Sequence, residues 1–315
     1  MKRAFAQINI AVLLWGFTGI LGKAISLSAP ALVWYRMSLA AIIMFVVITF
    51  RKEWIPIAKK DIFKLMGIGT LFAVHWVAFY ASVKLANASI AMVCLATASV
   101  FTAVLDPLLN GRKFNKIELF LSLIAVLGVV FIYVLQPANT EPEHQMVNFE
   151  LGLALGIAAS IISAIFTVFN KPLADKYPAR PLVFCEMTSG LVFLSILAPF
   201  YIAKFPAEQL MPVGWDFLWI FLLAYCCTVW AQSLAMAALK NLSPFTVTLS
   251  VNLEPVYGII LAFLIFKENA QLGYGFYLGM SLIFISLMLQ VAVTINRSRK
   301  NKKNLEMLRI SNEPQ

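Results

Sequence analysis

The stretch ASVKLANASI, Ala81–Ile90, has a second copy in AALKNLSPFT, Ala237–Thr246, and each copy separates two long apolar segments. Each copy also belongs to a block of five such segments. Because an odd number of crossings leaves a chain on the opposite side of a membrane, the second block must be inverted relative to the first. This arrangement is typical of secondary transporters.

The composition independently indicates a membrane protein. Hydrophobic residues make up 61 % of the 315 residues, whereas soluble domains contain roughly half. A helix needs about 20 apolar residues to cross a hydrocarbon core about 30 Å thick. The sequence therefore predicts an all-α integral membrane protein with ten transmembrane helices, at about 6–27, 29–50, 62–83, 88–109, 117–135, 150–170, 181–203, 215–238, 244–266 and 273–295.

The two blocks can be aligned with each other. An offset of 156 residues aligns Lys84 with Lys240, and an offset of 148 aligns Lys23 with Lys171. We therefore divide the chain into a first repeat at 1–138, an external linker at 139–149, a second repeat at 150–296 and a basic cytoplasmic tail at 297–315.

The basic residues predict the orientation, because Lys and Arg accumulate in cytoplasmic loops. With the N-terminus inside, 20 of the 25 Lys and Arg residues fall on the cytoplasmic side, together with the C-terminus. The net charge of +10 then reflects orientation and attraction to anionic membrane lipid, and no nucleic-acid partner is expected. We expect a multi-pass protein of a bacterial-type cytoplasmic membrane, as a monomer or a homodimer.

Two cations, Lys23 and Arg36, fall near the outer ends of the first two helices. We expect them to extend to the lipid headgroups, with attraction of an anionic solute as the alternative.

Several segments resemble one transporter family. They are LEPVYGIILAFLIFKE at 253–268, the Gly-rich last helix from Gly273, VWYRMSLAAI at 33–42 and HWVAFYASVKLANAS at 75–89. Together they are similar to the EamA family of the drug/metabolite transporter superfamily. The resemblance implies ten helices, cytoplasmic termini and a central cavity lined largely by helices 1, 3, 4, 6, 8 and 9. The chain departs from the pattern after helix 4, where Gly111-Arg112 stands opposite Lys267-Glu268.

Polar residues at membrane depth are the candidates for transport, because an ionisable group there is costly and is a functional candidate by default. Glu254 lies near the middle of the predicted helix 9, and on a continuous helix it shares one face with Thr246, Ser250 and Tyr257. Pro255 also leaves a backbone carbonyl free near the midpoint. This stripe either lines a cavity, with Ser250, Glu254 and Tyr257 contacting substrate, or bonds to a neighbouring helix.

Predicted helix 3 carries the complementary candidates. His75, Trp76 and Tyr80 lie in an aromatic stripe, and Gln232 of helix 8 needs partners in hydrocarbon. Trp76, Tyr80 and Gln232 are candidate substrate contacts, with helix packing as the alternative. His75 joins Glu254 as a candidate for proton coupling, because histidine titrates near neutral pH, although a neutral bond between helices fits it equally. Glu186 is a weaker candidate, placed where water can reach it.

The sequence contains no recognisable catalytic or cofactor site. Its four cysteines lack metal-ligand spacing, and it has no phosphate-binding Gly-Lys-Ser loop. We therefore expect no cofactor and no enzyme activity. The hypothesis is a secondary transporter, acting as an exporter of small organic metabolites such as amino acids or amphiphilic solutes, by alternating access and with proton coupling. The alternatives are a lipid-modifying membrane enzyme and a phosphorylated-metabolite exchanger.

Overall fold

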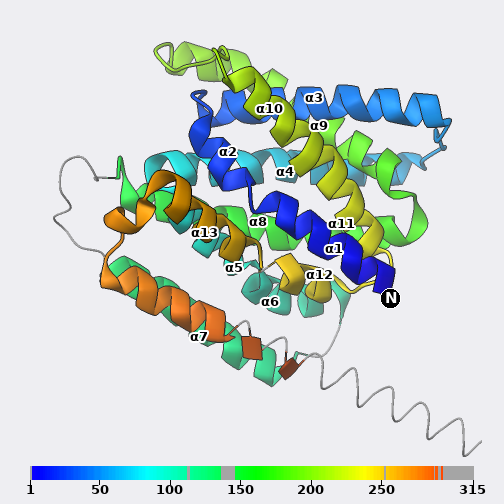
Figure 1. Cartoon of the computed structure of the whole chain (residues 1–315). Helices are drawn as coiled ribbons and strands as arrows, with labels where there is room; N and C mark the ends of the chain where they lie inside the picture. The colour runs from blue at the N-terminus through cyan, green and yellow to red at the C-terminus, as the bar shows by residue number, and fades with distance from the viewer. Residues whose placement is uncertain are drawn as a thin grey trace, which may run out of the picture.

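The computed structural model of the chain describes residues 2–111, 114–135, 146–251, 253–286, 288–289 and 292–293. These residues form helices and no strand (Figure 1). The basic tail at 297–315 and most of the predicted linker at 139–149 lie outside the described residues. The helices are α1 (Lys2–Trp15), α2 (Thr18–Ala24), α3 (Ala29–Arg51), α4 (Lys59–Leu85), α5 (Ala88–Ala96), α6 (Ala98–Asn110), α7 (Lys116–Val134), α8 (Phe149–Lys176), α9 (Ala179–Lys204), α10 (Asp216–Ala224), a π-helix (Tyr225–Trp230), α11 (Ala231–Leu239), α12 (Pro244–Val251), α13 (Glu254–Phe266), a 3₁₀ turn (Glu268–Gln271) and a last apolar helix (Tyr274–Ser286).

Seven segments among the described residues are long and apolar enough to cross a membrane. They are Arg3–Ala24, Ala29–Arg51, Lys59–Leu85, Ala88–Leu109, Phe149–Lys176, Ala179–Lys204 and Asp216–Leu239. The other three predicted segments contain shorter apolar helices, at Leu119–Val134, Glu254–Phe266 and Tyr274–Ser286. The chain is therefore a helical protein with seven candidate membrane spans.

Four of the predicted helices are interrupted near their midpoints. The first breaks between α1 and α2, the fourth at Thr97 between α5 and α6, and the eighth contains the π-helix. The ninth is divided into α12 and α13, so the unbroken helix expected at 244–266 is wrong. Breaks at membrane depth require partners for the freed backbone groups. Side chains supply some of them: Ser160 Oγ donates to the Cys94 carbonyl (2.8 Å) and Trp15 Nε1 donates to the Cys227 carbonyl (3.0 Å).

The interrupted fourth and ninth segments have matching boundaries. At the offset of 156 residues, the start of α5 aligns with the start of α12, and both ends of α6 align with both ends of α13. The residue after each pair of half-helices is left-handed, with φ of 65° at Gly111 and 52° at Lys267. Glycine adopts this conformation without strain, whereas lysine does so at a cost.

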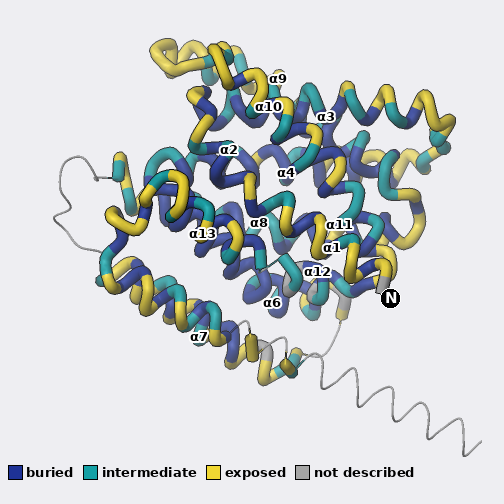
Figure 2. Tube along the Cα trace, viewed as in Figure 1, coloured by how far each residue is buried: buried dark blue, intermediate teal, exposed yellow. Residues whose placement is uncertain are grey.

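The centre of the bundle is formed by α4, which packs against both α8 and α9. Small residues allow the close approach, since a Cβ atom on Gly156 of α8 would lie 3.0 Å from the hydroxyl oxygen of Ser82 in α4. At one edge of the bundle α7 lies beside the last helix (Figure 1), where Gly128 and Gly279 meet backbone to backbone. Buried residues concentrate inside (Figure 2), while large apolar side chains such as Phe50 and Leu264 are exposed on the outside. Such a surface suits contact with lipid.

Candidate functional site

A cavity of about 90 Å³ lies inside the bundle. At about 10–15 Å³ for each water position, it has room for several waters or a small solute. Its walls come from both halves of the chain, and consist of Trp15, Thr18, Arg36, Phe72, His75, Trp76, Phe79, Leu95, Ala98, Ser163, Phe166, Thr167, Asn170, Gln232, Ala235, Met236, Leu239, Val247, Val251 and Glu254.

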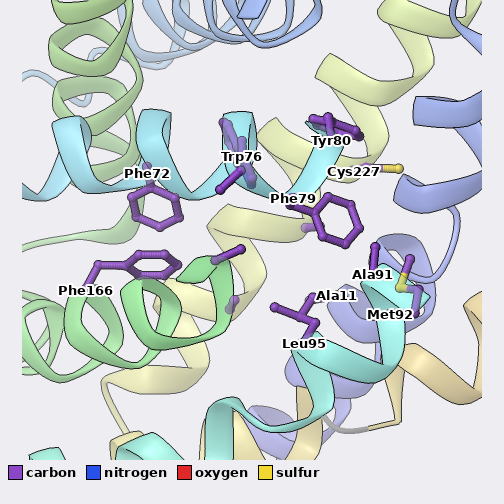
Figure 3. Close-up of a cluster of buried hydrophobic side chains, with 14 of the residues drawn as sticks. Ala11, Phe72, Trp76, Phe79, Tyr80, Ala91, Met92, Leu95, Phe166 and Cys227 are labelled. Atoms are coloured by element: carbon purple, nitrogen blue, oxygen red, sulfur yellow. The ribbon is translucent and has the colours of Figure 1, made fainter. Parts of the chain in front are cut away.

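One wall of the cavity is aromatic. Phe72 of α4 stacks on Phe166 of α8 with ring centroids 3.9 Å apart, and Trp76 lies one turn further along α4 (Figure 3). Phe79 completes the row. These side chains recur at helical spacing on one face of α4, so they give this wall of the cavity an apolar surface, as is typical of ligand pockets.

Arg36 is a cavity residue, which corrects the expectation that it extends to the headgroups. It begins the third turn of α3 and is only 1 % exposed. Its guanidinium lies 3.7 Å from the centroid of the Trp76 ring. Nε donates to Thr228 Oγ1 (2.6 Å), Nη1 to the Tyr80 hydroxyl (2.7 Å) and Nη2 to the Cys227 carbonyl (3.2 Å). These partners and the stacked ring hold the cation inside the protein.

All of these partners are uncharged, so the positive charge of Arg36 is not neutralised. No ion pair connects Arg36 to a carboxylate of the described residues. A guanidinium has five N–H donors, of which the three bonds above use only part. An isolated buried charge is costly unless it is paired, so the cavity holds a cation suited to an anionic partner.

Glu254 contributes a carboxyl group to the same cavity. It is the first residue of α13, is 4 % exposed, and accepts a long hydrogen bond from Thr18 Oγ1 (3.4 Å). The break between α12 and α13 places it at the start of a half-helix rather than within a continuous one. The positive end of that helix dipole favours a negative charge at this position. Arg36 and Glu254 therefore face one cavity without forming an ion pair with each other.

His75 lines the cavity and also bonds to a neighbouring helix. Its Nδ1 lies 2.8 Å from the Ala159 carbonyl of α8. Because a carbonyl can only accept, Nδ1 carries a hydrogen and Nε2 is the nitrogen free to change its protonation. The helix-to-helix bond anticipated for His75 is therefore present, and its role in proton coupling stays a prediction.

The other predicted site residues separate into two groups. Trp76 and Gln232 line the cavity. Tyr80 is not a lining residue, but its hydroxyl accepts a hydrogen bond from Arg36, which is one. Ser250 donates to the Thr246 carbonyl within its own helix (3.0 Å) and is not a lining residue. Tyr257 is 37 % exposed and is also absent from the lining. The expected stripe therefore does not face the cavity as a whole: Glu254 lines it together with Val247 and Val251, whereas Tyr257, three residues further along α13, is exposed.

Glu186 is another departure from expectation, because it is fully buried rather than accessible to water. It lies on α9, and the Asn170 side chain of the cavity wall is next to it.

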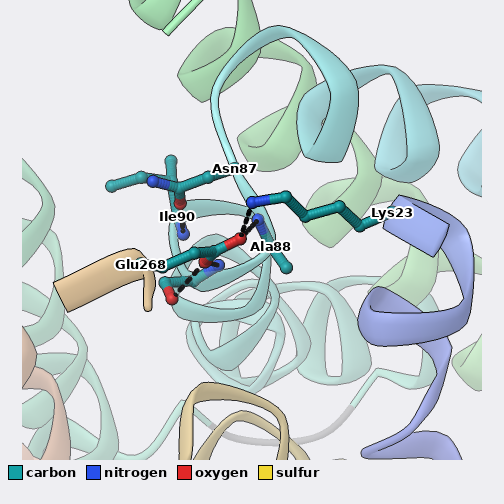
Figure 4. A network of polar contacts seen from close by, with 6 residues as sticks. Lys23, Asn87, Ala88, Ile90 and Glu268 are labelled. Carbon is teal, nitrogen blue, oxygen red and sulfur yellow. Dashed lines mark hydrogen bonds and ion pairs between the residues drawn. The ribbon is translucent and has the colours of Figure 1, made fainter. Parts of the chain in front are cut away.

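A polar network that the sequence did not suggest joins the end of α2, the start of α5 and the 3₁₀ turn after α13 (Figure 4). Glu268 is completely buried and forms an ion pair with Lys23 (2.7 Å). Its carboxylate also accepts from the backbone nitrogens of Ala88 (3.2 Å) and Ser89 (2.9 Å) and from the Ser89 hydroxyl (2.6 Å). Lys23 is therefore paired rather than extended to headgroups. The only signal was the acidic end of the 253–268 segment, which has no counterpart after helix 4.

An apolar bundle that encloses a charged cavity defines the class as a multi-pass membrane protein, and comparison with known proteins supplies the family. The sequence profile of the EamA-like transporter family matches residues 4–134 and 150–291. The chain belongs to this family.

Curated relatives are consistent with this assignment. An uncharacterized transporter of Archaeoglobus fulgidus is 26 % identical over 195 residues, covering 61 % of this chain and 66 % of the relative. An uncharacterized transporter of Synechocystis sp. is 29 % identical over 143 residues, covering 45 % of this chain and 41 % of the relative. The matches thus span less than two thirds of either relative.

A solved structure titled "Crystal structure of protein" has the same fold. It superposes with a TM-score of 0.63 at 16 % identity, covering 93 % of this chain and 98 % of that chain.

Proposed function

We propose that this chain is a secondary transporter that exports a small zwitterionic organic solute, such as an amino acid, by alternating access. The observation that carries the proposal is the unpaired placement of Arg36 and Glu254 in one cavity. A solute with a carboxylate and an ammonium group can bind the first with its anion and the second with its cation. Its side chain would pack on Trp76, which already lies against the guanidinium.

The proposed architecture is ten transmembrane helices in two inverted five-helix repeats. The coincident boundaries of α5 with α12 and of α6 with α13 support it. Cavity residues also occur in pairs at the offset of 156, as in Trp76 with Gln232 and Ala98 with Glu254. Binding between repeats, at interrupted helices near mid-membrane, is the arrangement that permits alternating access.

In this proposal both termini lie in the cytoplasm of a bacterial-type cell and the protein crosses its cytoplasmic membrane. The network of Lys23 and Glu268 then lies at the outer side. A second hollow, lined by residues that include Arg3, Tyr177 and Lys240, shares Met236 with the cavity at the inner side. The conformation fits a state that is closed outside and approaches the cytoplasm, from which an exporter loads its solute.

Two other functions fit the site less well. A doubly charged phosphate ester would meet the carboxyl group of Glu254 in the cavity and only one guanidinium, whereas recognition of phosphate favours several basic groups. A lipid-modifying enzyme needs reactive groups gathered at one membrane face. Arg36, His75 and Glu254 instead face an internal cavity.

Counterflow in proteoliposomes tests the proposal. Vesicles preloaded with unlabelled leucine, phenylalanine or threonine are diluted into the same labelled amino acid, with glucose 6-phosphate as the comparison solute. We expect exchange of at least one neutral amino acid, inhibition by its excess, and no inhibition by its decarboxylated amine. Exchange of the phosphate ester with no exchange of any amino acid would reject the proposed substrate class.

Coupling to protons is proposed at Glu254, with His75 as the second candidate. Glu254→Gln keeps the shape of the side chain but cannot carry a proton. We expect it to abolish accumulation driven by a pH gradient. Unchanged accumulation with and without the gradient would exclude Glu254 as the coupling group.

A further inference from the structure

A second buried carboxyl group, Glu186, lies beside the cavity and is not required for holding a zwitterion. It is on α9, about 10 Å along the helix axis from the first residue, Ala179, at 1.5 Å per residue. The residue is 0 % exposed, and its carboxyl oxygens form no hydrogen bond within 3.5 Å among the described residues, although the Asn170 side chain interacts with them. Burying an ionised carboxylate costs free energy, and buried polar atoms normally have hydrogen-bond partners.

The polar neighbour of Glu186 is Asn170 of α8, which is 2 % exposed. Asn170 Oδ1 is also buried without a hydrogen-bond partner among the described residues, although the residue itself lines the cavity. A carboxamide both accepts and donates. It can therefore accept from a protonated Glu186 through Oδ1, or donate to an ionised Glu186 through Nδ2. The two states require different orientations of the amide.

No charged group of the packed elements neutralises Glu186. The elements packed against α9 are α3, α4, α8 and α11. Arg36 of α3 has the three partners described above, and His75 of α4 bonds to Ala159. Among the other charged groups of these helices and of α9, three pairs are Asp61 with Lys176, Lys171 with Asp175 and Arg180 with Glu53. Lys84 donates to the Ile25 carbonyl. The remaining charged side chains are exposed, namely Arg51, Lys59, Lys60, Lys64, Glu150 and Lys204, and α11 carries none within its bounds.

The contact between α4 and α9 brings the two backbones close together at Glu186. A Cβ atom on Gly69 of α4 would overlap the Glu186 carbonyl oxygen, and one on Gly190 would lie 2.6 Å from the Gly69 carbonyl oxygen. The backbones of α4 and α9 are therefore in direct contact beside Glu186. The Asn170 side chain, which lines the cavity, is the polar group that links the carboxyl group to it.

We propose that Glu186 and Asn170 form a proton-binding switch in the cavity wall. Glu186 takes a proton from the cavity side and donates it in a hydrogen bond to Asn170 Oδ1. On release the proton returns to solvent in the cavity, and the amide turns to donate Nδ2 to the carboxylate. Each change reverses the polarity that Asn170 presents to the cavity. The switch adds to the proposed transport function a proton-binding site that is separate from the solute site. Proton binding at Glu186 can be measured whether or not the chain transports a solute.

The test uses the proton as the only ligand. The full chain in liposomes is titrated while its infrared spectrum is recorded, and the carbonyl stretch of protonated carboxyl groups is followed. We expect a component that disappears as pH rises and that Glu186→Gln removes. Glu254→Gln identifies the contribution of the other cavity carboxyl, and Glu150→Gln, which alters an exposed residue at the start of α8, should leave the component unchanged.

A second variant keeps the test decisive if Glu186→Gln does not fold. Asn170→Ala removes the acceptor, so the pH-dependent component should shift in frequency to that of a carboxyl group without this hydrogen bond. Loss of the component in Glu186→Gln and its shift in Asn170→Ala support the switch. If Glu186→Gln removes no component beyond the one that Glu254→Gln removes, or if no component moves in Asn170→Ala, the switch is overturned. Because no organic solute takes part, neither result depends on whether the chain transports amino acids.

Discussion

Replacing Arg36 by Gln gives the sharpest test of how the cavity recognises its solute. The substitution removes the charge but leaves an amide that can still donate toward Thr228 or Tyr80. In the proposed complex the guanidinium forms a buried, hydrogen-bonded pair with the carboxylate of the solute. We therefore expect the loss to appear as weaker binding of zwitterions.

The size of the effect follows from the burial of Arg36, which is 1 % exposed. Truncating one partner of a buried charge pair costs about 2–5 kcal/mol. Since about 1.4 kcal/mol corresponds to a factor of ten, the concentration for half-maximal counterflow should rise between about 30-fold and a few thousand-fold. Arg36→Lys keeps the charge but loses the planar fork and its stacking on Trp76, so its loss should be intermediate.

The assay is counterflow of the neutral amino acid that exchanges fastest, measured over a range of concentrations. Arg180→Gln is the matched control, because Arg180 pairs with Glu53 and its side chain is 38 % exposed. Exposed pairs contribute about 0–1 kcal/mol, so this variant should keep the native affinity. Gel filtration and thermal melting establish that both variants are folded. A folded Arg36→Gln protein with native affinity for the amino acid would refute the assignment of Arg36 to the solute carboxylate.

Two further predictions concern stability in detergent. Glu268→Gln removes the charge that binds Lys23, and breaking a buried ion pair costs about 3–5 kcal/mol. Because the Lys23 side chain is 29 % exposed, we expect a loss at the lower end of this range, measured as a clear drop in melting temperature. An unchanged melting temperature would argue against a stabilising role for this pair. Gly279→Leu should also lower the melting temperature, since a Cβ atom there would overlap the Gly128 carbonyl oxygen and overpacking costs about 1–3 kcal/mol. Gly67→Leu, with no atom within 4 Å of the added Cβ, is its control and should melt like the native chain.

Hydropathy was sufficient to predict the class of protein and the positions of the long helices. Apolar segments of about 20 residues have one stable solution in lipid, since only a helix satisfies its own backbone. The segments predicted at 29–50, 88–109 and 181–203 therefore differ by only a few residues from the helical spans Ala29–Arg51, Ala88–Leu109 and Ala179–Lys204. The segment 253–268, together with 33–42, 75–89 and the Gly-rich last helix, likewise indicated the family, which the profile match confirms.

The site was less predictable because it depends on contacts between distant segments. Trp76, Gln232, His75 and Glu254 were recognised as polar or aromatic residues at membrane depth, and all of them line the cavity. Arg36 was misplaced. Its position near the outer end of a predicted helix was compatible with extension to the headgroups and with burial. Burial is observed because Thr228 and Tyr80, which are distant in sequence, lie within hydrogen-bond distance.

Periodicity and composition are local properties of the sequence. They predict the helices and the orientation without any knowledge of packing, and the doubled stretch is read directly from the sequence. The face that each helix turns to the cavity is different, because it depends on the neighbouring helices. In the assembled bundle α13 directs Glu254 to the cavity and leaves Tyr257 at the surface. In a medium without water, polar groups must find partners inside the protein. The pairing of Lys23 with Glu268 and the separation of Arg36 from Glu254 therefore arise only when all the helices are assembled.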